Sequence, residues 1–136
     1  MQRNLNKHGF ILILLSLFTG FAIPVAEAAR LALSAHTIGL MSGILLIAVA
    51  AAWPSMVLGE KQKKIVYWGW VYSSYANWFA ILVGALAGAG RMTPLASRGM
   101  TAAEPVELFV SFLLISLSLA AIAAAALSIL GIVRSN

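Results

Sequence analysis

Residues 106–133, VELFVSFLLISLSLAAIAAAALSILGIV, decide the class of fold that is open to this chain. The run holds one charged side chain, Glu107, which stands at its start. A helix that crosses a lipid bilayer needs about 20 mostly apolar residues, because each residue adds about 1.5 Å of rise. The run therefore predicts a membrane-spanning helix.

Three more stretches of the same kind stand upstream of this run. The segments between them hold most of the charged residues, and the densest charge run is Glu60-Lys61-Gln62-Lys63-Lys64. Together the chain offers four expected spans, at residues 9–25, 33–53, 65–89 and 106–133. The sequence predicts an all-α fold, a single integral-membrane four-helix bundle domain over residues 1–136.

The composition excludes an ordinary soluble domain. Of the 136 residues, 62% are hydrophobic and 10% are charged, against about 45–50% and about 25% in soluble proteins. The chain has no cysteine, which excludes disulfides, zinc–thiolate sites and thiol nucleophiles. Its aromatic residues do not alternate with Lys or Arg, so no nucleic-acid partner is expected. The partner to expect is the lipid bilayer.

The net charge of +5 is best explained by membrane orientation, since cytoplasmic loops carry an excess of Lys and Arg. Three basic residues fall on one side of the expected spans, Arg30, Arg91 and Arg98. The other side holds Arg3, Lys7, Lys61, Lys63, Lys64 and Arg134. This predicts both termini and the 59–64 loop in the cytoplasm, in the inner (cytoplasmic) membrane of a bacterium.

The first span has a second interpretation as a cleaved signal peptide. Lys7 gives a basic start, residues 10–21 an apolar core, and Ala26-Glu27-Ala28 an A-x-A cleavage site. Cleavage would leave three spans and turn the amino terminus outward. Both interpretations stay open at this point.

His36 is the main candidate for chemistry, because ionisable groups inside a bilayer are costly and mark functional sites. The chain contains no Asp, and its first three spans contain no Glu, Lys or Arg, which excludes a carboxylate proton relay there. His36 lies about one turn into the second span. Its imidazole could bind a metal or haem iron, or move a proton. The alternative is an interfacial histidine bonded to a backbone carbonyl or lipid headgroup. His8, beside Lys7, is expected at the cytoplasmic edge.

Gly39 and Gly43 follow His36 at i+3 and i+7, so the three share a helix face. Their G-x-x-x-G spacing allows close helix contact, and glycine beside a histidine could also leave room for a flat cofactor. Asn77 lies near the middle of the third span, where an amide needs hydrogen-bond partners. It predicts either a polar seam between helices or the wall of an active site. On the residues alone, an oxidoreductase, a transporter subunit and an isomerase all remain open.

Several segments, in order along the chain, carry a family resemblance. They include Leu33-Ser34-Ala35-His36, Gly39-Leu40-Met41-Ser42-Gly43, Tyr75-Ala76-Asn77-Trp78 and Pro94-Leu95-Ala96. The chain resembles the hydroxylaminobenzene mutase family of small integral-membrane isomerases over nearly its whole length. It departs from that pattern at Ser42, where the family carries Asn.

The resemblance implies conversion of an arylhydroxylamine (hydroxylaminobenzene) into a 2-aminophenol, a step in nitroaromatic degradation. The hydroxyl oxygen moves from nitrogen to the ortho ring carbon without net redox change. The blocks around His36 and Asn77 are also similar to styrene oxide isomerase, which converts an epoxide into an aldehyde. The likeness to that enzyme implies a homotrimer that holds haem b. Epoxide isomerisation is the alternative function, although Ile81 stands where that enzyme carries a tyrosine.

These implications give a mechanistic hypothesis. His36 would bind the haem iron as its metal ligand, and the iron would act as a Lewis acid toward the departing oxygen. The expected cofactor contacts are His36, Gly39, Gly43 and Arg91, with Arg91 toward the propionates. The expected catalytic side chains are Asn77 for hydrogen bonding, Tyr72 or Tyr75 for proton relay or stacking, and Ser42. A haem-free enzyme would use His36 as acid–base catalyst. A haem-binding electron carrier and a non-catalytic membrane subunit are the alternatives of another class.

Overall fold

The computed structural model describes residues 1–134, and all regular structure within that range is helical. Residues 135 and 136, the last two of the expected domain, lie outside the described residues. In chain order the elements are α1 (Gln2–Thr19), η1 (Gly20–Val25), α2 (Ala29–Ala52), η2 (Trp53–Ser55), α3 (Glu60–Ala87), α4 (Pro94–Ser97) and α5 (Glu104–Val133).

The long helices coincide with the four expected stretches but begin earlier. The basic run predicted as a loop at residues 59–64 is instead the first turn of α3. Its backbone is capped at Gly59, whose N–H donates to the Gln62 side-chain oxygen at 3.1 Å. Charged residues therefore extend α3 beyond its apolar part, which apolar content alone could not show.

Three helical segments are long and apolar enough to cross a membrane, namely Gln2–Val25, Ala29–Ser55 and Glu104–Val133. Helix α3 is not among them, although it has 28 residues. Its middle is rich in Tyr, Trp, Ser and Asn, and these residues lower its mean hydropathy. The residues that make α3 a weak span are the ones that line the cavities described below.

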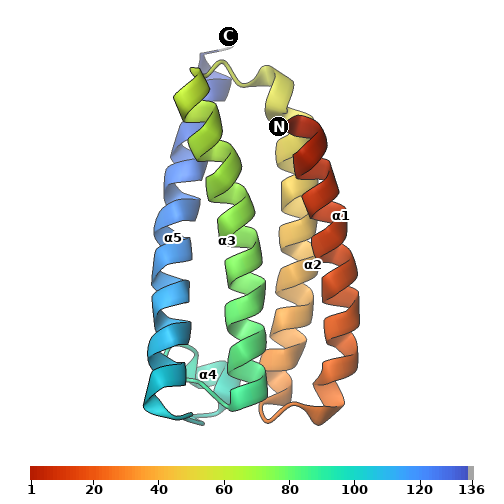
Figure 1. Ribbon diagram of the computed structural model, residues 1–136, viewed down its shortest axis with the longest axis vertical. Helices are drawn as coiled ribbons and strands as arrows, with labels where there is room; N and C mark the ends of the chain where they lie inside the picture. The colour runs from red at the N-terminus through yellow and green to blue at the C-terminus, as the bar shows by residue number, and fades with distance from the viewer. Residues whose placement is uncertain (135–136) are drawn as a thin grey trace.

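Figure 1 shows the four long helices running side by side along the long axis of the molecule. Both termini lie at one end, together with the turn between α2 and α3. The η1 turn and α4 lie at the opposite end. The start of α1, the end of α5 and the basic start of α3 therefore share one end of the molecule.

The helices form an open row instead of a closed bundle. Helix α1 packs on α2, α2 on α3, and α3 on α5, whereas α5 hardly touches α1 or α2. A closed bundle would bring α5 against α1 around a common core. Because α5 makes little contact with α1 or α2 within residues 1–134, α3 keeps two open faces, one between α1 and α5 and one between α2 and α5.

Glycines set the close crossing of α1 and α2. A Cβ added to Gly9 would lie 2.7 Å from the Gly43 carbonyl oxygen, and one added to Gly43 would lie 2.7 Å from the Gly9 oxygen. A Cβ on Gly39 would lie 2.6 Å from Trp78 Cδ1 and 2.7 Å from Ser16 Oγ. Helix α1 and Trp78 thus fill the space beside Gly39 and Gly43, and of their two predicted uses the structure displays helix packing.

Candidate active site

A small polar pocket lies on the α3 face between α2 and α5. Its volume is about 110 Å³, which is room for a few water molecules or a small polar group. The structure brings together two predicted catalytic residues here, one from α2 and one from α3. The lining residues are Ser42, Leu45, Trp70, Ser73, Ser74, Asn77, Leu117 and Ala121.

Three polar side chains in this pocket have no partner among residues 1–134. The Ser74 hydroxyl is buried and makes no hydrogen bond, and none joins Ser42 or Asn77 to other described residues. An unsatisfied polar group in an apolar interior costs about 1–3 kcal/mol. The pocket therefore presents hydroxyl and amide groups that a polar ligand would satisfy.

Trp70 is held rigidly at the edge of the pocket. Its indole N–H donates to Ser128 Oγ at 3.1 Å, and the Ser128 hydroxyl donates to the Ala124 carbonyl at 2.7 Å. The neighbouring Ser73 hydroxyl donates to the Trp70 carbonyl at 3.3 Å. The Trp70–Ser128 bond joins α3 to α5 beside the pocket, and the other two bonds hold its ends in place within each helix.

Tyr72 and Tyr75 lie on the other open face of α3, away from Asn77. They line a larger groove of about 670 Å³. The Tyr72 hydroxyl lies 2.6 Å from Ser116 Oγ on α5, and the Tyr75 hydroxyl donates to the His8 carbonyl on α1 at 3.2 Å. The predicted catalytic residues are therefore divided between two cavities.

His36 faces α1 and lines neither cavity. Its Nδ1 lies 2.7 Å from the Ser16 carbonyl oxygen, and the Ser16 hydroxyl donates to the His36 carbonyl. A carbonyl can only accept, so Nδ1 carries a proton and donates it to Ser16. The ring is thus tied to a backbone carbonyl, as the structural interpretation of His36 anticipates.

The same geometry fits a haem ligand. Metal-binding histidines commonly donate their other ring N–H to a backbone carbonyl, which fixes the tautomer and the orientation of the ring. Within residues 1–134, Nε2 of His36 makes no hydrogen bond. No group of three His, Cys, Asp or Glu gathers in this part of the chain. His36 could therefore serve as a single protein ligand to a metal ion or a haem iron.

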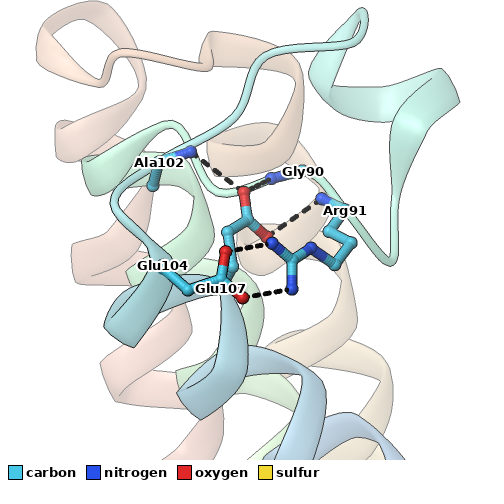
Figure 2. A network of polar contacts seen from close by, with 5 residues as sticks. All are labelled: Gly90, Arg91, Ala102, Glu104 and Glu107. Atoms are coloured by element: carbon cyan, nitrogen blue, oxygen red, sulfur yellow. Dashed lines mark hydrogen bonds and ion pairs between the residues drawn. The ribbon is translucent and has the colours of Figure 1, made fainter.

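Arg91 is paired with an acidic side chain in the loop between α3 and α5. Its guanidinium donates to both carboxylate oxygens of Glu104, one of them at 2.9 Å (Figure 2). The hydrogen bond and charge of Glu104 raise the pKa of Arg91 above its ordinary value. Arg91 was expected to contact a cofactor, and the structure places it in this exposed ion pair with Glu104.

Comparison with known proteins identifies the family of this chain. A family model described as styrene oxide isomerase matches residues 1–133. The chain belongs to the styrene oxide isomerase family. Among its relatives is the hydroxylaminobenzene mutase HabB of Ectopseudomonas oleovorans, 39% identical over 133 residues, which are 97% of this chain and 81% of HabB. The mutase HabA of the same organism is 36% identical over 135 residues, 98% of this chain and 100% of HabA. No solved structure gives a significant match.

This member of the styrene oxide isomerase family is an isomerase with membrane-type helices. The family match includes α1, the helix with the competing signal-peptide interpretation.

Glu107 has a role in this isomerase that sequence reasoning missed. Its carboxylate is 1% exposed and accepts backbone N–H groups from Gly90 at 3.1 Å, Arg91 at 3.1 Å and Ala102 at 2.9 Å (Figure 2). In the sequence it stood out only as the one charged side chain of the fourth expected span. The available signal was a carboxylate in the first turn after a loop rich in Gly and Pro, whose backbone donors need acceptors.

Two other residues of the sites also escaped sequence reasoning. No role was predicted for Ser74, although it is the buried unpaired hydroxyl of the pocket. His8 was expected at the membrane edge, yet its ring reaches the groove and contacts Tyr75. The sequence gives the positions of Ser74 and His8 along their helices, but not which other helices face these side chains.

Proposed function

We propose that this isomerase rearranges an arylhydroxylamine into the corresponding 2-aminophenol, with the hydroxylamine group of the substrate in the pocket formed by Ser42, Ser74 and Asn77. The observation that carries the proposal is the set of unpartnered hydroxyl and amide groups in an otherwise apolar structure. Two relatives over nearly the whole chain are named hydroxylaminobenzene mutases. A hydroxylamine group has the N–H, O–H and lone pairs that can serve as partners for these unpaired side chains.

The reaction balances within one molecule. The N–O bond breaks and a C–O bond forms at the ortho carbon of the ring. The proton on that carbon leaves, and the nitrogen gains one to become the amine. No external oxidant or reductant is needed, which matches an isomerase.

The pocket residues act on the departing oxygen. The Asn77 amide donates to the oxygen as negative charge develops on it, while its carbonyl accepts from the substrate N–H. The Ser42 and Ser74 hydroxyls provide two further donors. The Ser42 side chain is shorter than the Asn of the resembling family, and Ser74 adds a second hydroxyl to the pocket from α3. In this arrangement Tyr72 and Tyr75 lie outside the pocket.

Apolar walls protect the reacting species from bulk water. Leu45 and Leu117 close the sides of the pocket, and the fixed ring of Trp70 forms its edge. Once the N–O bond lengthens, the ring becomes electrophilic and water would add to it. Excluding water keeps the oxygen on the ortho carbon of the same molecule.

A haem b held by His36 is part of the proposal, and its fit rests on the Ser16 carbonyl that orients the imidazole. A bound haem iron would supply Lewis acidity for N–O cleavage. Within the chain, the Ser16 carbonyl orients the His36 ring. Gly20 lies against the same ring, and a side chain at position 20 would crowd it, since its Cβ would lie 3.3 Å from His36 Nδ1. A homotrimer, implied by resemblance, would cover apolar side chains exposed along the open row.

We also propose the membrane arrangement that the charges favour. Helix α3 would cross the bilayer as a fourth span, shielded by α2 and α5 on either side. Both termini and the basic start of α3 would face the cytoplasm of a bacterium, across its inner membrane, because they share one end of the molecule. The apolar groove and pocket would then receive substrates that dissolve in lipid.

Epoxide isomerisation is the second candidate, because the matching family model bears the description styrene oxide isomerase. An epoxide also develops negative charge on oxygen as its ring opens, so the same donors would serve. It lacks a proton donor, however, and would leave the Asn77 carbonyl unpaired. This difference favours the hydroxylamine.

Substrate assays on the purified full chain test the proposal. Wild type and His36→Ala are compared by absorption spectrum and by assay with phenylhydroxylamine and with styrene oxide. The account expects 2-aminophenol from wild type, with a Soret band that is lost with the activity in His36→Ala. Conversion of styrene oxide alone would make this chain an epoxide isomerase. A haem-loaded protein that is inert to both would contradict the isomerase account of the pocket.

A further inference from the structure

The groove between α1 and α5 is not explained by the polar pocket. It crosses the outer face of α3 where α1 and α5 fail to meet, and its volume is about 670 Å³. Small-molecule sites in proteins usually have volumes of about 300–1,000 Å³. Its lining residues are His8, Ile11, Trp68, Val71, Tyr72, Tyr75, Ala76, Trp78, Phe79 and Leu113.

Three of the aromatic rings in this groove are held by hydrogen bonds to neighbouring helices. Tyr72 bonds to Ser116 on α5 at 2.6 Å and Tyr75 to the His8 carbonyl on α1 at 3.2 Å. The Trp78 indole N–H donates to Thr19 on α1 at 2.9 Å. Side chains that only faced lipid would not need such fixing. The groove is therefore preorganised, which lowers the entropy cost of binding.

The aromatic rings and the polar group of this groove indicate which kind of ligand it would bind. His8 and Tyr75 meet edge to face with centroids 5.8 Å apart, and Trp78 and Phe79 meet at a tilt with centroids 6.4 Å apart. The ring of an aromatic ligand can pack edge to face, or offset and stacked, against rings arranged in this way. The polar feature is the Tyr75 hydroxyl, which donates to the His8 carbonyl at 3.2 Å and lies 3.3 Å from His8 Nδ1. A hydroxyl oxygen has two lone pairs, so one remains that can accept from a ligand.

We propose that this groove binds a monocyclic aromatic molecule that carries one O–H or N–H donor, at a site separate from the polar pocket. The ring packs among Trp68, Tyr72 and Phe79, and the donor bonds to the Tyr75 oxygen. The ligand class is that of the substrate and product of the proposed function, so the inference rests on that function for its choice of arene. The groove opens sideways between α1 and α5, where an arene dissolved in lipid would arrive.

Binding of inert fluorinated arenes tests the proposal without requiring turnover. The full chain is placed in phosphatidylcholine nanodiscs and titrated with 4-fluorophenol, or with fluorobenzene, which lacks the donor. Fluorine NMR reports the bound fraction, and empty nanodiscs give the partition into lipid. We expect saturable binding of 4-fluorophenol to wild type beyond that partition.

Groove-filling variants locate the site. Leu113→Trp on α5 and Ile11→Trp on α1 project a large ring into the groove from opposite walls, so at least one is expected to remain folded. Each should weaken binding by about 10-fold or more, the scale at which a ligand loses its space. Leu119→Trp, on α5 but 67% exposed and outside the groove, should bind as wild type. Equal binding by the groove and control variants would overturn the proposal.

Two further variants separate the groove from the pocket and from the proposed function. Tyr75→Phe should weaken the binding of 4-fluorophenol by about 5-fold, because one neutral hydrogen bond is lost. The binding of fluorobenzene should not change.

Asn77→Ala should lose isomerisation but keep arene binding. Loss of both activities would overturn the proposal of a separate site. Absence of saturable binding to wild type, as when an acyl chain fills the groove, would also overturn it. Saturable binding by a protein that does not isomerise arylhydroxylamines would remove only the proposed function.

Discussion

At the scale of single residues, the polar groups left unpaired in the structure are the most informative. Ser74 is 3% exposed and unpartnered, whereas Ser128 is also buried but accepts from Trp70 and donates to Ala124. A satisfied hydroxyl contributes to stability, and an unsatisfied one costs stability that only a ligand recovers. We therefore expect mutations of these two buried serines to change the free energy of unfolding in opposite directions.

Ser74→Ala should raise the free energy of unfolding by about 1 kcal/mol, because it removes a buried hydroxyl with no partner. The same change should lower isomerase activity. Ser128→Ala should destabilise by about 1–2 kcal/mol, since the Trp70 N–H is then left unpaired. Thermal denaturation in detergent measures both variants. A Ser74→Ala protein that is less stable than wild type would show that its hydroxyl is already satisfied.

At the scale of elements, the junction between α3 and α5 depends on Glu107. Its carboxylate gathers three backbone donors from the loop, while Glu104 makes an exposed ion pair with Arg91. Exposed ion pairs contribute little to stability, and hydrogen bonds to a buried charge contribute more. The two glutamates of α5 thus differ in role although they are three residues apart.

Glu107→Gln should destabilise the protein by about 2 kcal/mol, because the side-chain NH₂ group cannot accept from a backbone N–H. Hydrogen exchange should accelerate at Gly90, Arg91 and Ala102 while the middle of α5 stays protected. The matched variant Glu104→Gln should leave both observables near wild type. Loop exchange that is the same in the two variants would contradict the role given to Glu107.

The crossing of α1 and α2 makes a second prediction about elements. Gly43→Ala should destabilise by about 1–3 kcal/mol, the usual cost of overpacking, because its Cβ would meet the Gly9 backbone at 2.7 Å. Ala48→Leu adds more volume to α2 at an exposed position and should be tolerated. Thermal midpoints in detergent compare the two. Equal midpoints would show that the helices can separate without cost.

Sequence reasoning predicted helices but not how they face each other. Apolar runs predicted all four long helices, since length and hydropathy are local properties. The start of α3 at Glu60 was missed because charged residues form helix as readily as apolar ones. That Ser42 and Asn77 share a pocket while Tyr75 faces away depends on the rotation of α2 and α5 about α3. That rotation is set by packing across the chain, and no local pattern reports it.

At the scale of the whole molecule, the charge distribution predicts one orientation. The chain lacks cysteine, so Lys61→Cys at one end and Arg98→Cys at the other are unique labels. Both positions are exposed. A maleimide that cannot cross membranes should label Arg98→Cys in spheroplasts, and Lys61→Cys only after lysis. The reverse pattern would contradict cytoplasmic termini.

The open row of helices also explains how a chain this small could provide chemistry. Helix α3 presents its polar residues to one side and its aromatic residues to the other, because α5 leaves both faces uncovered. A closed bundle would have buried these residues against each other. The account therefore places isomerisation on the polar side and arene binding on the aromatic side.

The most direct test of the polar pocket compares kcat/KM for 2-aminophenol formation from phenylhydroxylamine in wild type and Asn77→Ala. The control is Ser118→Ala on the exposed face of α5, whose hydroxyl bonds only to Leu114 of its own helix. The account predicts a loss of about 100-fold or more in Asn77→Ala, as for removal of a donor to a developing oxyanion, and near wild-type activity in Ser118→Ala. An Asn77→Ala protein that folds and retains wild-type kcat/KM would contradict the central claim.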